Sequence, residues 1–149
     1  MKRIQYVFLF LLFSFYACKN NDSTPKAEND IDAVRSFIRS ALDGKFDEAR
    51  LYLLPDSSNE QYMDAAQRNY QKSDADTRYG YKNASINIHL VKPVNDSTTV
   101  VIFSNSFKND HDTLKVLRIS GKWLVDLKYL YLHDMDTIPF NTIKKDSIR

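Results

Sequence analysis

The hydrophobic pattern of this chain changes its period once, near Asn83. Before that point apolar residues recur every three or four positions, and the clearest run is Ile31, Val34, Phe37, Ile38, Ala41 and Leu42. After it apolar and polar residues alternate, as in Ile86, Ile88 and Leu90. The first spacing gives a helix one apolar face, and the second gives a strand one. Both can be buried together when helices pack on one face of a sheet, so the pattern predicts an α+β fold.

Three helices are expected in the first half of the chain. They cover residues 31–42, 46–54 and 59–72, with Asn29 or Asp30 as the first N-cap, Gly44 after the first helix and Pro55 after the second. Residues 73–82 are polar and are expected to form a loop. Four strands follow, over 84–90, 97–108, 112–120 and 123–127, with turns at 93–96 and 109–111. Sequential strands joined by short turns form an antiparallel meander.

This order of elements resembles the nuclear transport factor 2-like (cystatin-like) cone, and above all the small lipoprotein domains of that superfamily. The resemblance lies in the leading segment DIDAVRSFIRSALDGKFDEARLYL, in the strand pairs from Ala84 to Leu130, and in the closing segment Gly-Lys-Trp-Leu-Val-Asp-Leu at 121–127. It covers residues 31–130 and includes no catalytic signature. It implies N-terminal helices packed on a curved antiparallel sheet, a cavity between them that sometimes binds a small molecule, and often a homodimer surface.

The first 17 residues have the composition of a secretory leader. Lys2 and Arg3 precede an almost wholly apolar run from Ile4 to Ala17. As a helix these fourteen residues would extend about 21 Å, which is short of the roughly 30 Å hydrocarbon core of a bilayer. A signal peptide over 1–17 is therefore expected rather than a permanent membrane span.

Cys18 is the only cysteine and follows the leader directly. The segment Phe15-Tyr16-Ala17-Cys18 resembles the lipobox of bacterial lipoproteins, although Phe15 and Tyr16 depart from its usual aliphatic and small residues. The resemblance implies that the Cys18 thiol carries a diacylglycerol, with palmitate-type acyl chains holding the protein on a membrane. By analogy with the sorting of bacterial lipoproteins, Lys19 after the cysteine implies the outer rather than the inner membrane, and either face of that membrane stays open. The alternative is an ordinary cysteine beyond an ordinary secretory leader.

Removing Lys2 and Arg3 with the leader reduces the 21 basic residues to 19, equal to the 19 acidic residues. A neutral mature chain gives no reason to expect nucleic acid as a partner. Residues 18–30 are polar and are expected to be a lipidated, flexible tether, residues 31–130 the folded domain, and residues 131–149 a tail. With only three glycines, the chain offers no glycine-rich phosphate loop.

Asp126 is the one carboxylate that the pattern suggests as a pocket acid, since Val125 and Leu127 flank it. Strand alternation, however, places it opposite those neighbours, where an outward ion pair with Lys128 is the simpler interpretation. The histidines His89, His111 and His133 form no ligand pair along the chain. We therefore expect no catalytic residues, no metal and no cofactor.

Seven of the sixteen aspartates precede Ser or Thr. Five of these sites resemble an acceptor motif for O-glycosylation in exported bacterial proteins, and they are Asp22, Asp96, Asp112, Asp136 and Asp146. The alternative is that these pairs suit turns and helix caps.

Together these features favour a lipid-anchored, non-enzymatic module of the cell envelope that binds a small apolar ligand or an envelope protein. Two alternatives stay open. One is an isomerase or dehydratase with a polar pocket in the cone, and the other is an immunity or accessory protein.

Overall fold

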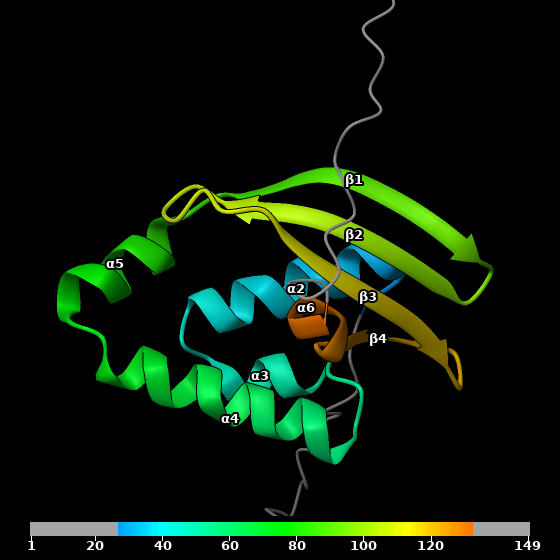
Figure 1. Ribbon diagram of the computed structural model, residues 1–149, viewed down its shortest axis with the longest axis horizontal. Helices are drawn as coiled ribbons and strands as arrows, with labels where there is room; N and C mark the ends of the chain where they lie inside the picture. Colours follow the sequence, from blue (N-terminus) through cyan, green and yellow to red (C-terminus); the bar gives the residue numbers. More distant parts are fainter. Residues whose placement is uncertain (1–26, 133–149) are drawn as a thin grey trace, which may run out of the picture.

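The computed structural model describes residues 27–132 (Figure 1). The signal peptide, Cys18 and most of the expected tether and tail lie outside the described residues. The helices and strands follow in this order: α2 (Asp30–Leu42), α3 (Phe46–Arg50), α4 (Ser57–Lys72), α5 (Ala75–Asn83), β1 (Ile86–Asn95), β2 (Thr98–Asn105), β3 (Asp112–Ile119), β4 (Lys122–Asp126) and α6 (Lys128–Leu132). The helices thus precede a four-stranded sheet, apart from the short α6 at its end.

The sheet is an antiparallel meander with the strand order β1-β2-β3-β4. It curves over α2, and α3 and α4 lie on the far side of that helix (Figure 1). The expected α+β class, with N-terminal helices packed on a curved antiparallel sheet, is therefore confirmed.

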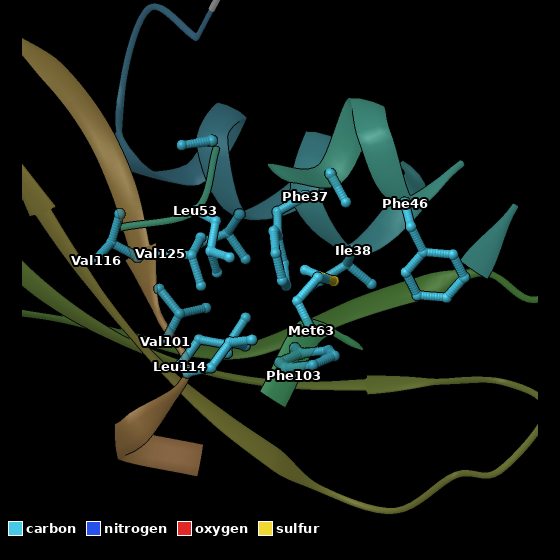
Figure 2. Packing of buried hydrophobic residues seen from close by; sticks show 14 residues of the cluster. Phe37, Ile38, Phe46, Leu53, Met63, Val101, Phe103, Leu114, Val116 and Val125 are labelled. Carbon is cyan, nitrogen blue, oxygen red and sulfur yellow. The ribbon is translucent and has the colours of Figure 1, made fainter. Parts of the chain in front are cut away.

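The core lies between α2 and the face of the sheet that covers it. Val34, Phe37 and Ile38 of α2 are buried. Phe37 and Ile38 face Val101 and Leu114 from the two central strands (Figure 2). Met63 of α4 and Leu53 complete the cluster from the other side. The helical and alternating apolar residues of the sequence thus meet in one core.

The expected loop over 73–82 is wrong, because α5 occupies this segment. The Asp74 side chain caps α5 by accepting a hydrogen bond of 2.6 Å from the Thr77 backbone N–H. At the other end the Arg39 guanidinium donates to the carbonyls of Tyr81, Lys82 and Ala84 at 2.8–3.2 Å. α5 has no buried residue, so no apolar period marked it in the sequence. Side chains instead form hydrogen bonds with the backbone N–H and C=O groups that a helix leaves unpaired at its two ends.

The turn expected at Pro93–Asp96 begins later than predicted, because β1 continues through Pro93 to Asn95. Pro93 lies opposite Thr99 of β2, and β1 is the first strand of the sheet. Proline lacks a backbone N–H and is tolerated on an edge strand, where one side of the backbone needs no donor. The proline therefore indicated the edge of the sheet rather than the end of the strand.

The second expected helix is also shorter than predicted, since α3 ends at Arg50. Tyr52 to Leu54 instead run parallel to the outer side of β4, with Leu53 bridged to Val125. The Val125 N–H donates to the Tyr52 carbonyl at 2.7 Å, and the Leu54 N–H donates to the Val125 carbonyl at 2.9 Å. The chain before Pro55 thus covers one edge of the sheet.

Candidate functional site

Asp126 lies at the end of β4 and is 7% exposed. The expected outward position is therefore wrong, although the expected partner is present, because the Lys128 Nζ lies 3.6 Å from the Asp126 Oδ1. The same carboxylate oxygen accepts a hydrogen bond of 3.2 Å from the Lys128 backbone N–H. Strand alternation alone does not predict this burial, because it does not show that the chain just after β4 is hydrogen-bonded to Asn59 at the start of α4.

Lys128 also forms an ion pair with Asp56, the N-cap of α4. The hydrogen bond from Lys128 and those from the Asn59 and Ser58 backbone lower the pKa of Asp56 below its usual value. The hydrogen bond to Asp56, with the nearby Asp126 charge, raises the pKa of Lys128. The ammonium group thus joins two carboxylates and stays charged, which suits a structural connection between α4 and β4 better than proton transfer.

Asn59 is fully buried and completes this connection. Its Oδ1 accepts a hydrogen bond of 2.8 Å from the Leu127 N–H. Its Nδ2 donates to the Leu54 carbonyl at 3.2 Å and to the Asp56 carboxylate at 2.8 Å. We call Asp56, Asn59, Asp126 and Lys128 the polar clamp. Sequence analysis missed the role of Asn59, and its one signal was a polar residue on the apolar side of a helix.

Two histidines that are far apart in the sequence lie together on the sheet. The rings of His89 and His111 are 4.3 Å apart between centroids and nearly perpendicular, at 77°. The His89 Nε2 lies at a hydrogen-bonding distance of 2.8 Å from the Oγ of Ser104, which is 1% exposed. Their spacing along the chain did not predict this contact. The strand order explains it, since β1 and β3 flank β2.

The His89–His111 pair supplies only two possible metal ligands. Within residues 27–132, no three His, Cys, Asp or Glu side chains are grouped so that they could hold a metal ion. His133 and Cys18 lie outside the described residues. None of the helices in the described part of the chain combines the length and the apolar character needed to cross a membrane.

Tyr70 has the only side-chain hydroxyl in residues 27–132 that is buried without a hydrogen-bond partner among those residues. Burial raises the pKa of this phenol, so it stays protonated. Its ring packs against Phe46 and Tyr81, with ring centroids 5.6 and 6.3 Å apart. The Arg39 Nε is the other buried side-chain atom without such a partner. Nine tyrosines in the sequence offered no spacing that selects one, and the tertiary packing selects Tyr70.

Strand β1 carries three of the seven exposed large hydrophobic side chains in residues 27–132. Leu90, Val91 and Val94 are 47%, 39% and 58% exposed. Leu90 pairs with Ile102 and Val91 with Val101, so the two side chains point to opposite faces of the sheet, and both are exposed. No further strand pairs with β1 within residues 27–132. We call the stretch His89–Asn95 the open edge.

The exposure of the open edge differs from what alternation predicts. Residues 84–90 alternate in the sequence, and the structure buries Ala84 and half-buries Ile86 and Ile88. Register shifts between Ile88 and Leu90 and between Pro93 and Asn95 break the alternation beyond that point. A shift of one residue turns the following side chains to the other face, so the apolar period stops predicting burial there.

Searches against protein-family models and against curated proteins found no match to this chain. Among solved structures, the chain is similar to an NTF-2-like protein of unknown function from Shewanella oneidensis MR-1. The sequences are 12% identical, the likeness covers 64% of this chain and 89% of that chain, and the TM-score is 0.48.

Proposed function

We propose that this protein is a lipid-anchored lipoprotein of the cell envelope, and that its domain is a non-enzymatic binding module for an extended segment of an envelope protein. The anchor rests on the apolar leader followed directly by the lone Cys18. The binding role rests on one observation, which is the open edge of β1 with its exposed Leu90 and Val91.

An edge strand presents unpaired backbone N–H and C=O groups to any extended chain beside it. Peptide segments that add to such an edge gain affinity from the backbone hydrogen bonds and specificity from alternate side chains. Leu90 and Val91 offer one apolar contact on each face of the sheet to an added strand. The polar clamp supports the non-enzymatic part of the proposal. Asp126 was the carboxylate considered as a pocket acid, and it is instead bonded to Lys128.

The test is photo-crosslinking in cells that export the full chain. A photoreactive amino acid at position 90 or 91 is expected to give a discrete adduct with an envelope protein. The matched control is position 79, because Tyr79 is 71% exposed and belongs to α5, which lies beyond the end of the sheet opposite to the C-terminal end of β1 (Figure 1). Adducts at position 79 that equal those at 90, or no adduct at either β1 position, would reject the binding role.

The anchor is tested separately with Cys18→Ser. The wild-type chain is expected to fractionate with membranes and to take up a labelled fatty acid, and the variant is expected to lose both properties. Unchanged fractionation and labelling of Cys18→Ser would reject the lipoprotein assignment while leaving the crosslinking result intact.

One observation favours a second function, an isomerase-like enzyme. The Tyr70 hydroxyl is buried and protonated and has no hydrogen-bond partner among residues 27–132. A phenol that can still donate a hydrogen bond is a group that can stabilise an enolate oxygen. Turnover of an enolisable ketone that is lost in Tyr70→Phe and kept in Tyr79→Phe would support this function. Equal rates in the two variants would reject it.

A further inference from the structure

Two turns lie at the same end of the sheet (Figure 1). One joins β1 to β2 at residues 95–98, and the other joins β3 to β4 at residues 119–122. Each is next to or includes an exposed aliphatic side chain, since Val94, one residue before the first turn, is 58% exposed, and Ile119, at the start of the second, is 44% exposed. We call this end, with its two turns, the turn end of the sheet.

The described chain begins at this same end. The Asp30 carboxylate at the start of α2 accepts a hydrogen bond of 2.6 Å from the Thr99 hydroxyl. Thr99 is the second residue of β2 and pairs with Pro93 of β1. Ala27, the first described residue, is packed against the core just before α2. The segment that leads from Cys18 therefore enters the domain beside the turn end.

The length of that segment limits which part of the domain can reach the membrane. Eight residues, 19–26, separate Cys18 from Ala27, and even fully extended the nine peptide steps span at most about 30 Å. β2 has eight residues and is about 25 Å long, so α5 and Tyr79 lie roughly that much farther from the point of entry. The turn end reaches a membrane at Cys18 with the least extension of the segment.

We propose that the turn end lies against the phospholipid surface of the membrane that carries the anchor, with Val94 and Ile119 inserted between the headgroups. This proposal rests on the lipid anchor of the proposed function and leaves the backbone of Leu90 to Pro93, the stretch between the two register shifts, free for the partner strand. Two small aliphatic side chains contribute only modestly to membrane affinity, because each buried methylene is worth about 0.8 kcal/mol. The anchor supplies the affinity, and the turn end sets the orientation of the domain.

Charge contributes little to this contact. The two turns and their flanks carry Lys92, Arg118, Lys122 and Asp96. Glu28, Asp30 and Asp32 lie at the start of α2, which the hydrogen bond between Thr99 and Asp30 joins to this end of the sheet. Because cations and carboxylates nearly balance, the apolar side chains carry the contact. The contact should therefore persist at about 1 M salt, where the Debye length is about 3 Å.

The test places an environment-sensitive fluorophore on single new cysteines, Val94→Cys, Ile119→Cys and the control Tyr79→Cys. The full chain is isolated from membranes in detergent and reconstituted into vesicles of phosphatidylethanolamine and phosphatidylglycerol with a nitroxide on some headgroups. All three positions are exposed, so the fold should tolerate the labels. We expect quenching at 94 and 119, at low and at high salt, and none at 79.

Two controls separate this proposal from the proposed function. The wild-type chain should take no thiol label, because a lipidated Cys18 has no thiol, and it should float with the vesicles. Labelling of wild-type Cys18 or failure to float would overturn the anchor and this orientation together. Flotation with equal quenching at all three positions, with none at 94 and 119, or with quenching that high salt removes, would overturn the orientation and leave the anchor standing.

Discussion

The two outer strands of this sheet differ in what lies beside them. The backbone of β4 is bonded to Tyr52 and Leu54 and, just beyond the strand, to the Asn59 side chain. The outer edge of β1 has no such neighbour within residues 27–132. One edge is thus part of the folded core, and the other is available for an interaction.

The difference shows how an edge strand can stay accessible without being a general site of aggregation. β1 is interrupted by two register shifts, contains Pro93 and carries Lys92, and each of these features discourages unlimited strand pairing. The uninterrupted stretch between the shifts runs from Leu90 to Pro93. A partner strand is therefore restricted to a short window, which favours a specific segment.

The largest expected effect on stability is the difference between truncating a leucine beside β4 and truncating a leucine on β1. Leu53 beside β4 is 3% exposed, and Leu90 on β1 is 47% exposed. Leu53→Ala leaves a cavity in the core and should lower the free energy of unfolding by about 2–5 kcal/mol. Leu90→Ala should change it by less than about 0.5 kcal/mol. Urea unfolding measures both, and similar losses would remove the distinction between the edges.

The next effect concerns the buried amide of the polar clamp. Asn59→Ala leaves the Leu127 N–H without its partner and removes one of the two hydrogen bonds to the Leu54 carbonyl, so the free energy of unfolding should fall by about 1–3 kcal/mol. The matched control is Asn87→Ala on β1, because Asn87 is exposed. Thermal unfolding compares them, and a stable Asn59→Ala variant would show that the closed edge does not depend on the clamp.

A smaller effect is expected where β1 joins the rest of the sheet. Ser104→Ala removes a buried hydroxyl that bonds to His89, which should cost about 0.5–1.5 kcal/mol of unfolding free energy. Ser97→Ala, at an exposed position beyond the end of β1, should be nearly neutral. If Ser104→Ala were as costly as Asn59→Ala, the two edges would be equally integrated into the core.

The smallest effect is a pH dependence of the clamp, because the Lys128–Asp56 pair is about one-third exposed, at 35% and 32%, and water screens it. The hydrogen bond from Lys128 lowers the pKa of Asp56 in the folded chain. Its contribution to stability is therefore present above the ordinary Asp range, near pH 4, and is lost as the pH falls through the folded pKa.

The pKa of Lys128 is raised, so its contribution is present below the ordinary Lys value and is lost as the pH rises through the folded pKa. Asp56→Asn keeps a capping oxygen and removes the charge. The stability difference between wild type and Asp56→Asn should be constant from about pH 5 to 9 and should shrink in acid. A difference that is independent of pH down to pH 2 would mean that the ion pair contributes nothing to the closed edge.

Sequence patterns predicted the elements whose apolar residues face the core. The first helix was expected over 31–42 and is observed over Asp30–Leu42, and the expected strand over 112–120 is observed over Asp112–Ile119. α5 could not be found in this way, because its stability comes from the Asp74 cap and from Arg39 rather than from an apolar face. The candidate site was predicted least well, since Leu90 and Val91 follow a bulge that breaks the period.

The sequence by itself determined that helices come first and strands later. The spacing of apolar residues within each segment gives the type of element, and the position of the segment in the chain gives the order. It also carries the leader and Cys18, on which the proposed anchor rests. Only the tertiary structure decided that Asp126 is buried beside Lys128, that His89 meets His111, and that β4 is covered while β1 is open. These features depend on contacts between segments that are far apart in the chain, and a local sequence pattern does not specify which distant segment will pack against it.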